Sequence, residues 1–238
     1  MAWVEAPDAW YCKGATNAGT LAAVLTGAVI VDVERIGKLL VANLSNGAAL
    51  GLRFGMTGRL IVDGEAAVDG LLYSSDRNLP EWDRFRLHFV DGGTLAIRDP
   101  RRLGGVELNP DVSRLGPDAA SISESQLRRV MRSRAPLKAV LLDQSRVAGI
   151  GNLLGDEILW RSALAPQREA RSLNDRDVKE LRLAMRGTIT LLTKRGGSHT
   201  GDFMEHRLIG GRCPLDGTTI RHAIVGGRST WWCEHHQV

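Results

Sequence analysis

The sequence is poor in cysteine and contains no long apolar run. Its cysteines are Cys12, Cys213 and Cys233, too few for a disulfide framework and typical of a reducing compartment, so we predict a cytoplasmic protein. No segment reaches the ~18 consecutive apolar residues that a membrane span needs. The N-terminus lacks the basic region and apolar core of a secretory signal. Neither sign of charge dominates, and the net charge of +4 is compatible with a nucleic-acid partner without establishing one.

The first part of the chain shows the period-two pattern of strands. Residues 29–34 and 39–44 are predicted strands, and Asn46-Gly47 is a hairpin signal that leads into a third strand over 48–54. A second hairpin has Phe85, Leu87 and Phe89 on one face and turns at residues 91–93. We therefore predict an antiparallel β-sandwich-like domain over residues 1–112.

The period changes to that of helices near residue 116, after the Asn109-Pro and Gly116-Pro breaks. Ser123 and Gln126 form a capping pair for a helix to about Ser133. Pro136 suits the first turn of a helix to Leu142. The remaining helix signals are Asn152–Trp160 and a long helix capped by Asn174, with Asp177 in its first turn and a buried stripe of Val178, Leu181, Met185, Ile189 and Leu192. These helices define a domain over 116–200, and residues 206–238 form a short β-hairpin tail.

A glycine-rich turn joins two of the predicted helices, in the stretch LLDQSRVAGIGNLLGDE from Leu141 to Glu157. Gly149 and Gly151 allow a partner to approach the backbone closely, and the first-turn amides after Asn152 suit phosphate. The stretch resembles the helix–two-turn–helix of the formamidopyrimidine-DNA glycosylase and endonuclease VIII family. Members of that family flip oxidised bases out of duplex DNA and cut at the lesion. The resemblance extends from about residue 20 to residue 238.

The resemblance implies an α+β fold with three parts. These are a β-sandwich-like domain that lacks the family's first strand and helix, a helix–two-turn–helix domain, and a zinc-finger-like β-hairpin. It also implies damaged double-stranded DNA as the partner and a base-excision-repair function, as a DNA glycosylase and AP lyase for oxidised bases.

Two residues correspond to phosphate contacts of the family. Asn152 matches the asparagine that contacts the backbone beside the flipped nucleotide, although by itself it is an ordinary helix N-cap. Lys38, in Arg35-Ile-Gly-Lys38, matches a lysine that contacts phosphate beside the lesion, although by itself it is a solvated lysine at a strand end.

Four residues correspond to side chains that enter the damaged site. Met56 in Leu52–Gly58, with Arg101 and Leu103 in Asp99–Gly104, matches the residues that fill the space left by the extruded base. Leu103 replaces the more usual phenylalanine, so stacking on the opposite base should be weaker. Arg228 falls where the family inserts an arginine from its terminal hairpin; alone, it is an ordinary solvated charge.

The tail contains two short clusters with the spacing of a metal site. Cys213 and Asp216 form Cys-x2-Asp, sixteen residues separate Asp216 from Cys233, and Cys233 and His236 form Cys-x2-His. Two such clusters on a hairpin are typical of a structural zinc site. The family's finger has four cysteines at this spacing, so an aspartate and a histidine replace two thiolates here, and His235 is the alternative fourth ligand. Without metal, the hairpin would be held by Ile224, Trp231 and Trp232.

The start of the chain departs from the family, whose mechanism uses the α-amine of an N-terminal proline followed by glutamate. This chain opens Met-Ala-Trp-Val-Glu, and Met1 aligns inside the family's first domain, as in an N-terminally truncated member. Three interpretations remain: a shortened reading of a normal enzyme, a paralogue that binds damage without cutting, or an enzyme in which the Ala2 amine and Glu5 serve instead.

Three functions therefore remain open. The first is a glycosylase and lyase of base-excision repair, and the second is a non-catalytic protein that binds abasic sites. The third is an RNA-binding module, which assigns no space-filling role to Met56, Arg101 and Arg228 and predicts comparable affinity for intact RNA.

Overall fold

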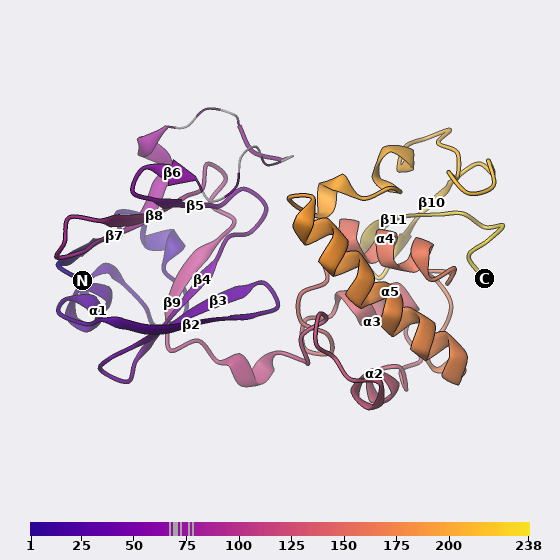
Figure 1. Cartoon of the computed structure of the whole chain (residues 1–238), viewed down its shortest axis with the longest axis horizontal. Helices are drawn as coiled ribbons and strands as arrows, with labels where there is room; N and C mark the ends of the chain where they lie inside the picture. The colour runs from indigo at the N-terminus through magenta and orange to yellow at the C-terminus, as the bar shows by residue number, and fades with distance from the viewer. Residues whose placement is uncertain (67, 69–70, 72, 76, 78) are drawn as a thin grey trace. The chain divides into compact units, whose positions relative to one another are not determined.

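A computed structural model describes residues 1–66, 68, 71, 73–75, 77 and 79–238. The chain forms two units, Met1–Val112 and Ser113–Val238, each with its own apolar core. The first contains antiparallel sheets, and the second contains helices and a terminal hairpin, so the predicted α+β class is confirmed (Figure 1). None of the helices in the described part of the chain is long and apolar enough to cross a membrane.

Two antiparallel sheets make up most of the first unit. One has the strand order β2-β3-β4-β9, with β2 at Ile30–Ile36, β3 at Leu39–Leu44, β4 at Ala49–Arg53 and β9 at Gly105–Leu108. The other has the order β1-β7-β8-β5-β6, with β1 at Trp3–Glu5, β7 at Asp83–His88, β8 at Thr94–Arg98, β5 at Arg59–Val62 and β6 at Glu65–Ala66. Both predicted hairpins are confirmed, as β3 pairs with β4 and β7 pairs with β8.

The core of the first unit follows the predicted alternation. Phe85 and Leu87 of β7 are buried, whereas Phe89, just beyond the end of the strand, is only partly buried. Helix α1 at Ala18–Leu25 begins in a capping box of Asn17 and Thr20, and its Leu21 and Leu25 join the same core. Because these two leucines are four residues apart, they lie on one face of the helix.

Four α-helices, several short 3-10 turns and one hairpin make up the second unit (Figure 1). The helices are α2 at Glu124–Val130, α3 at Leu137–Leu142, α4 at Asn152–Arg161 and α5 at Asp175–Lys194. The hairpin pairs β10 at Arg221–Val225 with β11 at Arg228–Trp232. Its β11 strand packs against α4, while α5 packs against α2 and α4.

The helix ends follow the predicted capping chemistry, with some corrections. Ser123 and Gln126 form the predicted capping box, but α2 ends at Val130 and not near Ser133. Pro136 is the N-cap of α3 and does not lie in its first turn. Asn174 and Asp177 form a capping box at the start of α5.

The buried stripe of α5 differs from the prediction at one position. Val178, Leu181, Met185 and Leu192 are buried as expected, but Thr188 takes the place predicted for Ile189, which is only partly buried. Residues three or four positions apart lie on the same face of an α-helix, and Thr188 lies three positions after Met185. The prediction chose Ile189 because isoleucine is more hydrophobic than threonine.

Candidate nucleic-acid interface and metal centre

A buried network of charges ties the terminal hairpin to the helices. Nζ of Lys138 in α3 lies 2.6 Å from Oδ1 of Asp156 in α4, and both side chains are fully buried. The Lys138 ammonium also donates to the Ser229 carbonyl at 3.0 Å and to Thr230 Oγ1 at 2.8 Å. Oδ2 of Asp156 accepts two hydrogen bonds from the Arg207 guanidinium, at 2.8 and 3.0 Å. Charge-assisted hydrogen bonds therefore hold β11 against α3 and α4.

The sequence analysis missed this network. Burial lowers the pKa of Lys138 and raises that of Asp156, while the ion pair between them opposes both shifts. Lysine and aspartate in an amphipathic helix usually lie on its solvated face, so the sequence pattern did not predict their burial. The available signal was that both occur among apolar residues, Lys138 within Leu137–Leu142 and Asp156 shortly before Ile158.

Asn152 binds the same hairpin. Its side-chain amide donates to the Ser229 carbonyl at 3.0 Å, next to Arg228 at the start of β11. The N-cap of α4 is Gly151, so the reading of Asn152 as an ordinary N-cap is wrong. Asn152 Oδ1 is buried and has no hydrogen-bond partner among the residues that the structure describes. The Asn152 amide therefore joins the first turn of α4 to Ser229, the residue next to Arg228.

Gln144 closes the glycine-rich turn before α4. Its Nε2 donates to the carbonyls of Leu142 and Ile150, at 2.8 and 3.0 Å, and its Oε1 accepts from the Gly149 amide at 3.0 Å. Gly149 has φ of +111°, a conformation that favours glycine. The turn thus fixes where α4 begins and where its first-turn amides lie.

The turn that carries Arg228 contacts α3 through Gly226. Gly226 and Gly227 have φ of +59° and +74°, and a Cβ on Gly226 would lie 2.6 Å from Cβ of Ala139. We expect Gly226→Ala to lower the free energy of unfolding by more than the ~1–2 kcal/mol of a left-handed alanine, because the added methyl also meets α3. Gly227→Ala is the matched control, since its Cβ would meet no described atom within 4 Å. Equal losses in thermal unfolding would contradict a role for the Ala139 contact.

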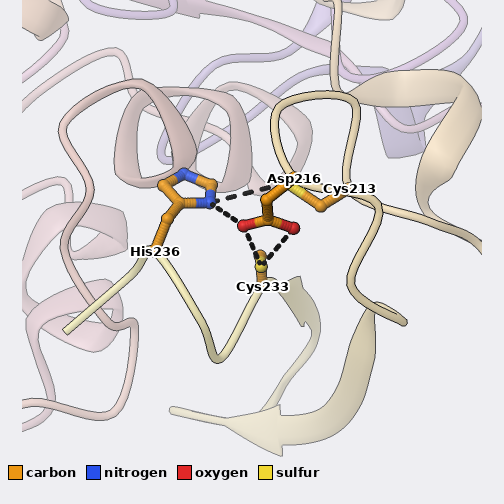
Figure 2. A group of neighbouring side chains, drawn as sticks. All are labelled: Cys213, Asp216, Cys233 and His236. Carbon is orange, nitrogen blue, oxygen red and sulfur yellow. Dashed lines mark hydrogen bonds and ion pairs between the residues drawn. The ribbon is translucent and has the colours of Figure 1, made fainter.

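The four predicted metal ligands lie together in the structure. The ligand atoms of Cys213, Asp216, Cys233 and His236 all lie within 4.8 Å of one another. Figure 2 shows the Asp216 carboxylate between Cys233 and His236, 3.3 Å from the Cys233 sulfur and 3.7 Å from His236 Nδ1. Cys213 Sγ lies 3.5 Å from the same Nδ1 (Figure 2). Two sulfurs, one imidazole nitrogen and one carboxylate form a donor set that suits a tetrahedral metal ion.

The histidine that faces this cluster is His236. Its Nε2 lies 3.0 Å from the Trp160 carbonyl, which directs Nδ1 toward the cysteines. Metal-binding histidines commonly donate their second N–H in this way, which fixes the tautomer and the ring orientation. His235, the alternative ligand, is exposed, and its Nδ1 lies 3.2 Å from Asp216 Oδ2.

The acidity of two members of the cluster depends on their surroundings. A hydrogen bond from the Thr218 amide holds the pKa of Asp216 below its ordinary value, so the carboxylate is ionised at neutral pH. Burial raises the pKa of the Cys233 thiol. Metal binding would therefore have to displace a proton from this thiol.

In the first unit, Asp99 shapes the loop that carries Arg101 and Leu103. The buried Asp99 carboxylate accepts hydrogen bonds from Thr57 Oγ1, from the Arg101 amide and from the Gly104 amide at 2.8 Å. Thr57 follows Met56, so one carboxylate anchors both loops of the predicted space-filling group. The loops also touch, since a Cβ on Gly55 would lie 2.7 Å from the Leu103 backbone.

The side chains predicted to contact DNA from this unit reach solvent. Met56 is 52% exposed and Leu103 is 44% exposed, whereas a core role would bury them. Arg101 is exposed, as is Lys38 in the turn between β2 and β3. The structure brings Met56, Arg101 and Leu103 together through Asp99, and places Lys38 on a separate turn. Their roles toward DNA stay predictions.

Asp8 provides an acid-sensitive link to the same loop. Arg102 donates to the Asp8 carboxylate through Nε at 2.6 Å and Nη2 at 2.5 Å, and this pair holds the pKa of Asp8 below its ordinary value. A depressed folded-state pKa contributes stability above the unfolded pKa, near 4, that is lost as pH falls through the folded value. Below about pH 4, we expect the free energy of unfolding of Asp8→Asn to fall less steeply than that of the unaltered protein. Denaturant unfolding at several pH values measures the difference. Identical pH profiles for the variant and the unaltered protein would contradict this expectation.

The first residues of the chain belong to the sheet. The Ala2 amide donates to the His88 carbonyl at 2.7 Å, and Glu5 Oε1 lies 2.7 Å from Nε2 of the same histidine. The Met1 amine donates to the Ala28 carbonyl at 2.6 Å. A catalytic role for Ala2 with Glu5 stays a prediction.

Comparison with known proteins agrees with this arrangement. The family model for the formamidopyrimidine-DNA glycosylase N-terminal domain matches residues 3–106, and that for the H2TH domain of the same glycosylase matches residues 115–203. The formamidopyrimidine-DNA glycosylase of Paracoccus denitrificans is 31% identical over 90% of this chain and 84% of the relative. That of Thermus thermophilus is 32% identical over 89% of this chain and 83% of the relative.

Solved structures show the same likeness. The Lactococcus lactis Fpg in complex with abasic-site DNA matches with a TM-score of 0.81 and 25% identity, over 100% of this chain and 92% of that one. The same protein with Fapy-dG-containing DNA gives the same TM-score, identity and coverage.

A β-sheet unit followed by a helix–two-turn–helix unit defines a protein of the DNA-glycosylase class. The chain belongs to the formamidopyrimidine-DNA glycosylase family.

Proposed function

We propose that this protein binds damaged double-stranded DNA and acts in base-excision repair. Membership of the formamidopyrimidine-DNA glycosylase family supports this function, as does the likeness to structures solved with abasic and Fapy-dG DNA. In this proposal Asn152 and Lys38 contact phosphates, while Met56, Arg101, Leu103 and Arg228 occupy the space left by an extruded base. The predicted cytoplasmic location stays a prediction.

The observation that carries the proposal is the link between Asn152 and the hairpin. Helix α4 presents first-turn amides that have no acceptor within the helix. Asn152 joins this turn to Ser229, and the exposed Arg228 is the adjacent residue. Free first-turn amides and a guanidinium are both groups that bind the phosphates of a DNA backbone.

Binding to a duplex with one abasic-site analogue tests the proposal. We expect the protein to prefer this duplex to the intact one, and Asn152→Ala to weaken binding by about 10- to 150-fold, the effect of losing one hydrogen bond to a charged group. Thr193→Ala, near the C-terminal end of α5 and remote in sequence from these residues, is the control. Fluorescence anisotropy at fixed salt provides the measurement. Equal affinity for the two duplexes, or for matched RNA, would contradict the proposal.

A separate experiment tests whether the protein also cleaves DNA. Borohydride reduction in the presence of abasic DNA traps a Schiff base between an amine of the protein and the sugar. A covalent band would show lyase chemistry, and peptide mapping would decide between a terminal amine and an internal lysine. Specific binding without a band would show that this polypeptide binds damage without forming a Schiff base.

The proposal includes a structural zinc ion held by Cys213, Asp216, Cys233 and His236. The proximity of the four donors and the hydrogen bond from His236 to Trp160 support this assignment. Zinc would join the segment at 213–216 to the end of β11, since each contributes two ligands. Its role is to hold the hairpin and not to take part in bond cleavage.

A further inference from the structure

Trp10 exposes an indole ring on the first unit. The side chain is 68% exposed and lies in a 3-10 turn at Ala9–Tyr11. Lys13 Nζ lies 5.1 Å from the centroid of its ring and donates to the Trp10 carbonyl at 2.7 Å. A large exposed aromatic ring beside a fixed cation is a common arrangement for binding a nucleobase and its phosphate.

The turn that carries Trp10 is attached to the loop 99–104. Asp8 Oδ1 accepts a hydrogen bond from the Trp10 amide at 3.1 Å and caps the turn. The same carboxylate binds the Arg102 guanidinium through both oxygens. Arg102 lies between Arg101 and Leu103, so one carboxylate joins Trp10 to the tip of this loop.

The next residues attach the turn to the far end of the loop. Tyr11 is fully buried, and a Cβ on Gly104 would lie 2.3 Å from its hydroxyl oxygen. The Lys13 amide donates to the Val106 carbonyl at 2.8 Å, and Cys12 forms a bridge with Val106 in β9. The position of Trp10 is therefore fixed relative to Arg101 and Leu103, and its side chain remains open to solvent.

We propose that Trp10 and Lys13 form a further DNA-binding site, in which the indole stacks on an unpaired base of the strand opposite the lesion and Lys13 binds the adjoining phosphate. The inference rests on the proposed function and adds a contact that it does not contain. A flat aromatic surface stacks on any base, so this site contributes affinity for distorted DNA without reading sequence. The contacts that hold Trp10 also hold the loop of Arg101 and Leu103. The Trp10 site and these space-filling residues would therefore act on one lesion.

The test uses a duplex with an abasic analogue and 2-aminopurine at the opposite position. We expect Trp10→Ala to weaken binding by about 5- to 150-fold, the range for loss of one base–aromatic stack, and Trp10→Phe to retain most of the affinity. We expect 2-aminopurine fluorescence to be quenched on binding by the unaltered protein and by Trp10→Phe, and to remain higher with Trp10→Ala. Lys13→Gln should weaken binding and reduce its salt dependence.

Trp3→Ala is the matched control, because Trp3 is also an exposed tryptophan of this unit but is stacked on His88 at 3.7 Å between ring centroids. It should leave affinity and quenching unchanged. If the unaltered protein prefers abasic DNA while Trp10→Ala matches Trp3→Ala in both readouts, this inference alone fails. If the unaltered protein shows no preference for abasic DNA, the proposed function fails and the inference fails with it. Thermal melting of each variant separates lost binding from lost folding.

Discussion

Asp156→Ala should lower the free energy of unfolding of the second unit by about 3–5 kcal/mol, the usual cost of breaking a buried ion pair on one side. The substitution leaves the buried ammonium of Lys138 without its carboxylate at 2.6 Å. It also leaves the Arg207 guanidinium, 8% exposed, without its acceptor. Each cation is then held in a medium that solvates it poorly. Denaturant unfolding followed by circular dichroism measures the change.

Two further variants separate charge from shape. Asp156→Asn keeps the size of the side chain and one acceptor oxygen. It should therefore lower the free energy of unfolding less than Asp156→Ala does, but more than a surface substitution does. Arg221→Gln breaks an ion pair with Glu234 on the same hairpin, where both side chains are about half exposed, and should leave stability unchanged. If Asp156→Ala lost no more stability than Arg221→Gln, the buried network would not be what holds the hairpin.

The strands and the side-chain capping boxes were predictable because they depend on neighbouring residues. The strand at Leu39–Leu44 and the capping box of Asn174 follow from alternation and from side-chain chemistry three residues apart. The spacing of Cys213, Asp216, Cys233 and His236 also identified the cluster, since a hairpin brings its two ends together.

The contacts that fix the candidate site could not be predicted locally. Lys138 meets Asp156 only after α3 and α4 pack together, and Asp99 meets Thr57 only after two loops of the first unit come together. Asn152 was predicted to be an ordinary N-cap, but its side chain bonds across to Ser229 and leaves Gly151 as the cap. These contacts depend on how distant segments pack, which local sequence patterns do not show.

Removal of zinc should disorder the terminal hairpin and reduce affinity for abasic DNA at least about tenfold. Structural zinc supplies an apparent ~10–16 kcal/mol to isolated finger peptides near neutral pH. Here the hairpin is also held by Lys138 and Asn152, so we expect local disorder and not global unfolding. Without an ion, the two thiols, the carboxylate and the imidazole would lie within 4.8 Å of one another with no cation between them. Metal analysis before and after chelation, with anisotropy binding on both samples, measures the effect.

Substitution of Asp216 tests the zinc assignment most directly, because a carboxylate is the poorest ligand for zinc beside thiolates. Asp216→Cys should retain zinc at higher chelator concentration than the unaltered protein, whereas Asp216→Ala should lose it at lower concentration. Cys233→Ser should lower zinc content and abasic-DNA affinity together. His235→Ala, which removes the exposed neighbour of the ligand histidine, should change neither quantity. If zinc content were the same in all four variants, or zero in the unaltered protein, the ion would have no part in holding Arg228 in place, and the charge network around Lys138 would have to do so alone.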